Sequence, residues 1–474
     1  MPREIALIIC VIFIVWLFAR DRNLRPMTSG ALWIVLLWIF IVGSRPVSLW
    51  FGLENKWMRL EDIAEGSPLD RYMFIVLIAL GLIVLHRRRI IWSEIIASNR
   101  VFFIFFLYCG ISVIWSEYTF VSFKRWVKDF GSVVMVLIIL SDKYPVKATK
   151  AVLARFTYIA IPLSVLFIKY FPDLGRYYNK WTYNVTYCGI GTEKNSLGLI
   201  VLTGGLYLFW DFIETRTTEE SGTDWSELAI RIVLSLMGGW LLAISDSATA
   251  LVCLILGAGT IYMMRLPVAR RQVRHLGTYS LAAISLILLI YFAPTILGLF
   301  TGIVGRNTTF TGRTNIWAGL LKESTNPIIG TGYQSFWTLD MRERYDVNSA
   351  HNGYLETYLS GGWIGVCLLI AMIVSAGRKM KGELLTGNSY SFLLFSFIIT
   401  TVYYNLTEAM FGGLSLIWIT FLLAALTYPG PHSEEQEEEQ DDYEEETCLD
   451  LSPNGNTRYA IPAIPQIAQK MNND

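Results

Sequence analysis

The segment AVLARFTYIAIPLSVLFIKYF, residues 151–171, decides the fold of this chain. Arg155 and Lys169 are its charged residues, and its length is close to the ~20 residues that a helix needs to cross a bilayer. Comparable apolar runs recur from one end of the chain to the other. They are continuously apolar rather than alternating, which indicates helices and excludes a barrel. The sequence therefore predicts an all-α polytopic membrane protein.

The composition excludes a soluble protein. Hydrophobic residues make up 53% of the 474 residues, and the mean hydropathy is +0.44. We expect a bundle of about 12 to 13 transmembrane helices with one large external loop. The candidate spans are 4–19, 31–49, 72–87, 101–116, 129–141, 151–171, 197–213, 227–244, 248–265, 277–299, 353–374, 389–405 and 411–428.

Basic residues in the short connections predict the orientation of the bundle, because loops rich in Lys and Arg remain cytoplasmic. The clusters that fall in alternate loops are Arg20/Arg22/Arg25, Arg87/Arg88/Arg89, Lys143/Lys147/Lys150, Arg265/Arg270/Arg271/Arg274 and Arg378/Lys379/Lys381. This pattern puts the N-terminus and the large loop 300–352 outside. We expect residues 1–428 to form the bundle, loop included, and residues 429–474 to form a separate cytoplasmic tail.

The tail has a composition of its own. It contains the acidic stretch EEQEEEQDDYEEE, residues 434–446, followed by a segment rich in Pro and Asn. Blocks of like charge with few apolar residues bury too little surface to fold, so we expect the tail to be disordered. It would serve as a solvated spacer or as an interaction tail.

The large external loop collects four arginines, Arg306, Arg313, Arg342 and Arg344, together with His351. Arginine presents a planar, permanently charged fork that matches phosphate geometry. We expect a short helix to begin near Arg313, where the sequence TGRTNIWAGLL passes from polar to apolar. Arg342 and Arg344 lie among acidic residues and are expected to pair with them or to contact lipid headgroups.

His351 is the candidate proton acceptor in this loop. A neutral imidazole accepts a proton near neutral pH, and Asn352 beside it is placed to orient the ring or the substrate. Two further external segments add candidate substrate contacts. Lys194 and Asn195 follow a loop rich in tyrosine, and Arg125 lies between aromatic residues at a predicted external boundary. Aromatic side chains of this kind suit sugar rings and equally suit the membrane interface.

An ordered series of short motifs runs through these segments. It comprises WSEY at 115–118, EKNSLG at 193–198, SDSATA at 245–250, GRTNIW at 312–317, NPIIGTGYQSF at 326–336 and HNGYLE at 351–356. In this order the series resembles the O-antigen ligase / exopolysaccharide polymerase family of bacterial inner-membrane enzymes. These enzymes act on glycans linked to undecaprenyl diphosphate.

The resemblance implies that Arg313 and His351 carry the chemistry. Lys194–Asn195 resembles the KN pair of the exopolysaccharide-polymerase branch, in which His often precedes the lysine. Here Glu193 occupies that place. The likeness also implies an inner-membrane protein whose active face is periplasmic.

We therefore predict a glycosyltransferase that polymerises repeat units of an exopolysaccharide or O-antigen. His351 would act as the general base, and Arg313 would hold the departing diphosphate, helped by Arg306 and Lys194. Asn195, Asn352 and Arg125 complete the predicted substrate-binding set. No cofactor or metal ion is expected, because the external loops contain no DxD motif and the cysteines lie far apart.

The predicted partners are the lipid-linked glycan, an acceptor glycan, membrane lipids and other polysaccharide-assembly proteins, with no nucleic acid. Two alternatives remain open. A ligase would transfer the finished glycan to lipid A-core or another acceptor, and a transporter or flippase would move it across the membrane. The second is disfavoured because the predicted spans carry few charges apart from Asp246, whereas transporters place ionisable groups near the midplane.

Overall fold

The computed structural model describes residues 1–25, 28–52, 67–178, 184–218, 225–275 and 313–429. Met1–Tyr428 forms one compact unit, and Pro429–Asp474 forms a second. Beyond Pro429 the tail lies outside the described residues, as do the predicted span 277–299 and Arg306. The account that follows concerns the first unit.

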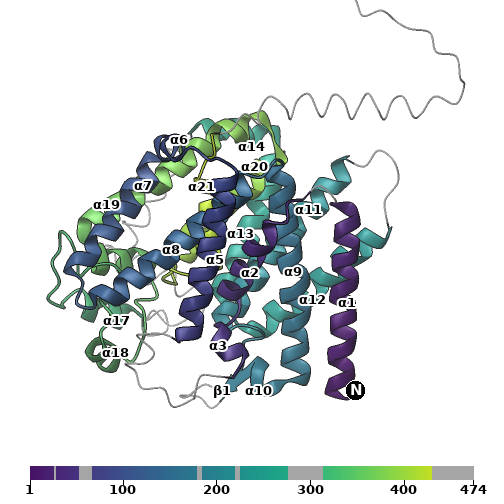
Figure 1. Cartoon of the computed structure of the whole chain (residues 1–474), viewed down its shortest axis with the longest axis horizontal. Coiled ribbons are helices and arrows are strands. Elements are labelled where there is room, and N and C mark those ends of the chain that lie inside the picture. The colour runs from purple at the N-terminus through teal and green to yellow at the C-terminus, as the bar shows by residue number, and fades with distance from the viewer. Residues whose placement is uncertain (26–27, 53–66, 179–183, 219–224, 276–312, 430–474) are drawn as a thin grey trace, which may run out of the picture. The chain divides into compact units, whose positions relative to one another are not determined.

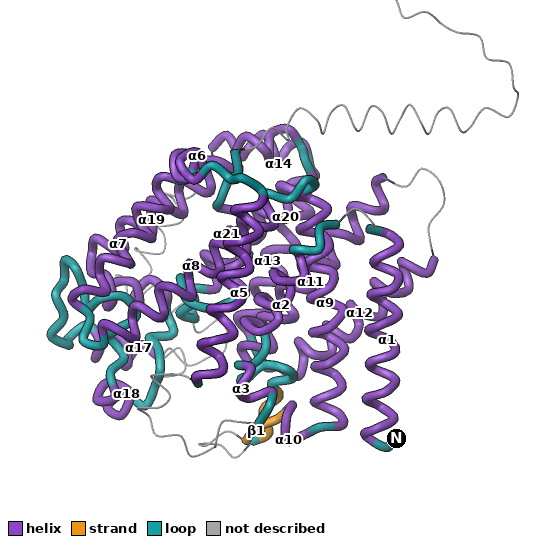
Figure 2. The backbone as a smooth tube through the Cα atoms, viewed as in Figure 1, coloured by secondary structure: helices purple, strands orange, loops and turns teal. Residues whose placement is uncertain are grey.

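The first unit is almost entirely helical (Figure 1). Its longer helices are α1 (Arg3–Leu24), α2 (Leu32–Gly43), α5 (Pro68–Arg87), α7 (Arg100–Ile111), α8 (Thr119–Leu140), α9 (Pro145–Tyr170), α11 (Lys194–Thr218), α12 (Trp225–Ser245), α13 (Ala248–Arg265), α19 (Gly353–Thr386), α20 (Ser389–Tyr404) and α21 (Leu416–Ala425). Shorter ones are α3 (Val47–Trp50), α6 (Trp92–Ser98), η1 (Ser112–Trp115), α10 (Pro172–Gly175), α14 (Pro267–Gln272), η2 (Val273–His275), α17 (Arg313–Leu320) and α18 (Leu339–Tyr345). Within the described ranges, one antiparallel pair of strands is formed by β1 (Arg176–Tyr178) and β2 (Val185–Tyr187) (Figure 2).

The predicted fold class is confirmed. Among the described residues, six helices have the length and composition of a membrane span, namely α5, α9, α11, α12, α13 and α19. The segments Trp92–Ser98 and Arg100–Trp115 meet these criteria only together and are bent by 101°, which fits either a broken span or a re-entrant loop. Three further apolar helices, α2, α20 and α21, are shorter. Every predicted span within the described residues overlaps a helix, and the number of crossings remains a prediction.

Burial separates an inner group of helices from an outer one. In the apolar 18-residue stretch of α9, 83% is buried inside the protein, and in the corresponding stretch of α11 the buried share is 72%. It falls to 28% in α12 and 22% in α13, which therefore present apolar side chains outward, as expected of helices that face lipid. α21 is buried along its whole length. The inner helices thus form a core on which the outer helices pack.

The two ends of the bundle differ in character. Figure 1 shows α17, α18 and β1 at the end where the N-terminus lies, and α6 and α14 at the opposite end. The large loop and the turn-rich segment around β1 therefore share one end. The basic segment of α14 lies at the other, in agreement with the alternation of basic loops.

α19 is broken where the large loop meets it. Gly362 has φ 60° and ψ −162°, outside the helical region. The loop segment 326–332 fills the break: the Trp363 N–H donates to the Pro327 carbonyl at 2.8 Å, and the Gly332 N–H donates to the Ser360 carbonyl at 2.9 Å. Backbone groups released by the break are satisfied in this way, as the interior of a membrane protein requires.

The close contact between the loop segment 326–332 and α19 explains why Gly330 and Gly362 carry no side chain. A Cβ atom at Gly362 would lie 2.3 Å from the backbone of Ile328, and one at Gly330 would lie 2.4 Å from the backbone of Ser360. Both glycines also have positive φ. The motif NPIIGTGYQSF therefore has a structural function, because it ties the large loop to a membrane helix.

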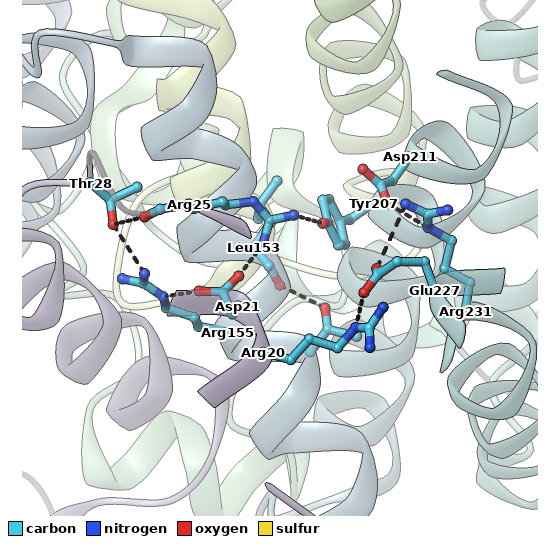
Figure 3. Close-up of polar contacts among 11 residues, drawn as sticks. Arg20, Asp21, Arg25, Thr28, Leu153, Arg155, Tyr207, Asp211, Glu227 and Arg231 are labelled. Carbon is cyan, nitrogen blue, oxygen red and sulfur yellow. Dashed lines mark hydrogen bonds and ion pairs between the residues drawn. The ribbon is translucent and has the colours of Figure 1, made fainter. Parts of the chain in front are cut away.

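A buried network of charges joins α1 to the bundle (Figure 3). Arg155 of α9 donates to Asp21 at the end of α1, with Nε to Oδ2 at 2.7 Å. Arg25 also pairs with Asp21 and donates to the hydroxyl of Tyr207 on α11 at 3.3 Å. Asp21 is 2% exposed. Paired charges of this kind hold three helices together where an unpaired charge would be costly.

The expectation that the spans carry few charges apart from Asp246 is wrong. Arg155 lies within a predicted span, as does Asp211, which pairs with Arg231 at 2.9 Å. Asp129 is buried in α8. Asp246 itself has a side chain that is 92% exposed. Ion pairs stabilise Arg155 and Asp211 inside the bundle, and a hydropathy pattern does not reveal such pairs.

We predict that Arg155→Met destabilises the protein by about 3 kcal/mol, because it leaves the buried Asp21 with one cationic partner fewer. Thermal unfolding in detergent would show a lower midpoint. Arg3→Met is the matched control, since the Arg3–Glu4 pair has side chains that are 68% exposed. Equal midpoints for the two variants would contradict the structural role of the network.

Candidate active site

The two residues predicted to carry the chemistry meet at a third, Glu408. Arg313 is the first residue of α17, His351 precedes α19 by two residues, and Glu408 lies in the turn between α20 and α21. The Nη2 atom of Arg313 lies 3.1 Å from Oε1 of Glu408. The Nδ1 atom of His351 lies 3.1 Å from Oε2 of the same carboxylate. Each oxygen of Glu408 therefore holds one member of the predicted pair.

The three side chains differ in exposure. Glu408 is almost buried, with 5% of its side chain exposed, whereas Arg313 has 23% and His351 has 32% exposed. Arg313 also donates to the carbonyl oxygen of Thr407. Since the effective dielectric falls with burial, the contacts to Glu408 are stronger than they would be in water. The carboxylate is thus withdrawn from solvent, while the cationic and imidazole groups remain accessible.

Asn195 belongs to this cluster, and its Nδ2 atom donates to Oε1 of Glu408 at 3.1 Å. Lys194 turns elsewhere: its Nζ atom lies 3.6 Å from Oδ2 of Asp246. Glu193 occupies the place of the histidine in the exopolysaccharide-polymerase branch. It lies close enough to Glu408 and His351 for their charges to affect its carboxyl group. Burial raises the pKa of its carboxyl, Glu408 raises it further, and His351 acts in the opposite direction.

Asn352 has a structural function. Its Oδ1 atom accepts from the N–H groups of Tyr354 and Leu355, both at 3.0 Å, so it caps the N-terminus of α19. The cap uses Oδ1 and fixes the start of the helix that follows His351, while Nδ2 lies 3.5 Å from the Leu406 carbonyl oxygen. A contact of this side chain with the imidazole or with substrate stays a prediction.

Arg125 lies apart from the Glu408 cluster. It donates to the carbonyl oxygen of Gln334, and Glu356 is among the charges close to it. Gln334 and Glu356 both line a cavity of about 50 Å³ between α7, α8 and α19. None of the four residues of the cluster, Arg313, His351, Glu408 and Asn195, lines this cavity. Arg125 therefore stays a substrate-binding prediction without a contact to the cluster.

The described part of the large loop has a small core of its own. Leu320, Phe336, Trp337, Ala350 and Leu359 are buried together. Outside this core, Arg344 contacts Glu323 at 3.1 Å and Asp340 at 2.7 Å, which confirms that it pairs with neighbouring acids. The helix expected near Arg313 is α17. Arg313 and His351 are therefore carried by a folded unit rather than by an irregular loop.

Sequence reasoning missed Glu408. It is a single acidic residue in a short turn, 57 residues after His351 and 95 residues after Arg313. The sequence feature that could have indicated Glu408 is its place between the predicted spans 389–405 and 411–428. The alternation of the spans puts this turn on the same side of the membrane as the large loop. Among the described residues, no group of three or more His, Cys, Asp or Glu side chains is arranged to hold a metal ion.

Comparison with known proteins agrees with the family resemblance of the motifs. The family described as O-antigen ligase matches residues 232–370, which include Arg313 and His351. The exopolysaccharide production protein ExoQ of Rhizobium meliloti (strain 1021) is 25% identical over 315 residues, which cover 63% of this chain and 68% of the relative. The chain is therefore similar to the O-antigen ligase / exopolysaccharide polymerase family, in agreement with the resemblance of its motifs.

Proposed function

We propose that this protein polymerises repeat units of an exopolysaccharide or O-antigen. It would transfer a glycan from an undecaprenyl-diphosphate carrier to a sugar hydroxyl at the periplasmic face of the bacterial inner membrane. The observation that carries the proposal is the shared carboxylate of Glu408, which holds a cation and an imidazole side by side. Such a pair suits a reaction in which one group loses a proton and another departs as an anion.

In the proposed reaction the acceptor hydroxyl oxygen attacks the anomeric carbon of the donor glycan. A carbon–oxygen bond to the acceptor forms, and the bond to the diphosphate oxygen breaks. His351 takes the hydroxyl proton on Nε2, because Nδ1 is directed at Glu408. The Nδ1–H group of His351 donates a hydrogen bond to Glu408, which fixes the tautomer that leaves Nε2 free to act as the base. The negative charge of Glu408 then stabilises the imidazolium that forms when Nε2 takes the proton.

Arg313 is the proposed partner of the leaving diphosphate. Its guanidinium has five N–H donors, of which Glu408 and the Thr407 carbonyl engage a part. Glu408 and Arg313 have opposite charges, so the cluster gains a net positive charge when His351 is protonated. That gain coincides with the appearance of negative charge on the diphosphate. Neutralisation by arginine, with Lys194 and Arg306 as further cations, is proposed in place of a metal ion.

Ligase activity is the second candidate, and one observation favours it: the matched region 232–370 belongs to a family described as O-antigen ligase. The bond chemistry is the same in both cases, and only the acceptor differs. The Lys194–Asn195 pair favours the polymerase, because Asn195 contacts Glu408 directly.

Deletion of the gene should leave lipid-linked single repeats and remove long polymer. Glycans extracted from the deletion strain would be separated by gel electrophoresis and mass spectrometry. Long lipid-linked chains that fail to reach their final acceptor would instead identify a ligase. Unchanged glycans would refute both proposals.

Arg313→Ala should lower polymer formation by about two to three orders of magnitude, as expected when a donor that stabilises the leaving charge is lost. Complementation of the deletion strain measures this loss. Arg344→Ala is the matched control: its side chain is 51% exposed and pairs with Glu323 on the loop surface. Equal polymer from the two variants would remove Arg313 from the site.

His351→Ala should lower activity by at least about a hundredfold, and Glu408→Gln by less, because the imidazole remains. If the two act as one unit, the double variant should be no worse than His351→Ala alone. Initial rates with repeats extracted from the deletion strain would be compared for the three variants. Multiplied losses in the double variant would show that Glu408 acts independently of His351.

A further inference from the structure

His351 lies at a conformationally unusual point of the chain. Its φ is 48°, in the left-handed region that residues with a side chain rarely adopt. Such a conformation costs free energy and persists only where the surroundings enforce it. The residue that precedes it, Ala350, is 1% exposed. The contacts of Ala350 therefore determine where the imidazole points.

Both backbone groups of Ala350 are held by side chains. The Ala350 N–H donates to Oε2 of Glu356 at 3.0 Å. The Ala350 carbonyl accepts from Nε1 of Trp317 at 2.7 Å. Glu356 lies in the first turn of α19, and Trp317 lies one turn after Arg313 in α17. One buried residue thus connects the helix that carries Arg313 to the helix that follows His351.

Glu356 is itself positioned by a second tryptophan. Nε1 of Trp337 donates to Oε1 of Glu356 at 2.7 Å, so each carboxylate oxygen receives one N–H. Trp337 belongs to the core of the loop and is 8% exposed. A carboxylate that accepts two N–H donors in this way has a defined orientation, and it transmits that orientation to the Ala350 backbone.

We propose that Glu356 and Trp317 are positioning residues that set the distance and angle between His351 and Arg313 through Ala350. The inference rests on the proposed function and adds to it two residues that no contact places in the reaction itself. It also assigns a function to Trp317, the last residue of GRTNIW, and to Glu356, the last residue of HNGYLE. Neither residue has an evident chemical role in these motifs.

Glu356→Gln tests the proposal without a change of shape. Glutamine offers one oxygen and one NH₂ group to two N–H donors, so the Ala350 and Trp337 donors compete for a single acceptor. We expect kcat to fall by about tenfold or more, since small displacements of catalytic groups have effects of this size. The KM for the lipid-linked repeat should change little, because Arg313 is untouched.

A double variant separates positioning from charge. Trp337→Phe removes the competing donor, so the oxygen of glutamine is released to accept from Ala350. Glu356→Gln with Trp337→Phe should therefore regain most of the kcat lost in Glu356→Gln and approach the value of Trp337→Phe alone. A double variant as inactive as Glu356→Gln would overturn the proposal, since it would show that the negative charge is what matters.

Trp317→Phe is the independent variant. It leaves the Ala350 carbonyl without its donor and should lower kcat in the same way. All variants are purified in detergent and assayed with repeats extracted from the deletion strain, and their unfolding midpoints are compared with the wild type. Wild-type kcat in Glu356→Gln and Trp317→Phe would refute the inference alone. Failure of the wild-type protein to extend these repeats would refute the proposed function instead.

Discussion

The candidate site depends on one carboxylate that is almost removed from water. Glu408 accepts from Arg313, His351 and Asn195, which come from three separate parts of the chain. A buried carboxylate without these partners would be strongly disfavoured, so the cluster is stabilised as a whole. Its position in the turn between α20 and α21 also decides where the large loop must dock, because Arg313 and His351 both belong to that loop.

The same constraint shapes the remainder of the bundle. Charges in the apolar interior are held by specific partners. Asp21 pairs with Arg155 and Arg25, and Asp129 accepts from the Tyr333 hydroxyl and the Gly413 N–H. Where the backbone leaves its helix, as at Gly362, another segment supplies the missing hydrogen bonds. The hydrophobic effect does not drive helices together within a bilayer, since lipid tails are equally apolar. Close packing at small residues such as Gly81 and Gly131 and polar contacts such as Arg155–Asp21 therefore act together to fix which helices are neighbours.

Hydropathy was sufficient to predict the helices, because a membrane span is a property of consecutive residues. Arg313 and His351 were also predictable, since both lie in an unusually polar loop and in recognisable motifs. Glu408 was not, because pairing across 57 residues depends on tertiary structure rather than on composition. The helix cap that Asn352 forms was not predicted either, because its position beside His351 drew attention to chemistry and not to the start of the next helix.

Two residues of the candidate site lie outside the region that the family model matches. The matched family region, 232–370, contains Arg313 and His351 but neither Glu408 nor Asn195. The loop thus supplies the imidazole and the guanidinium that we propose to react. The carboxylate of Glu408, in the turn between α20 and α21, and the amide of Asn195, in α11, hold these two groups. An exchange of the loop between relatives would keep this geometry only if the recipient bundle carried an acceptor at the position of Glu408. Under the proposed function the remainder of the loop is free to vary with the glycan, because contacts with the bundle hold Arg313 and His351 in place.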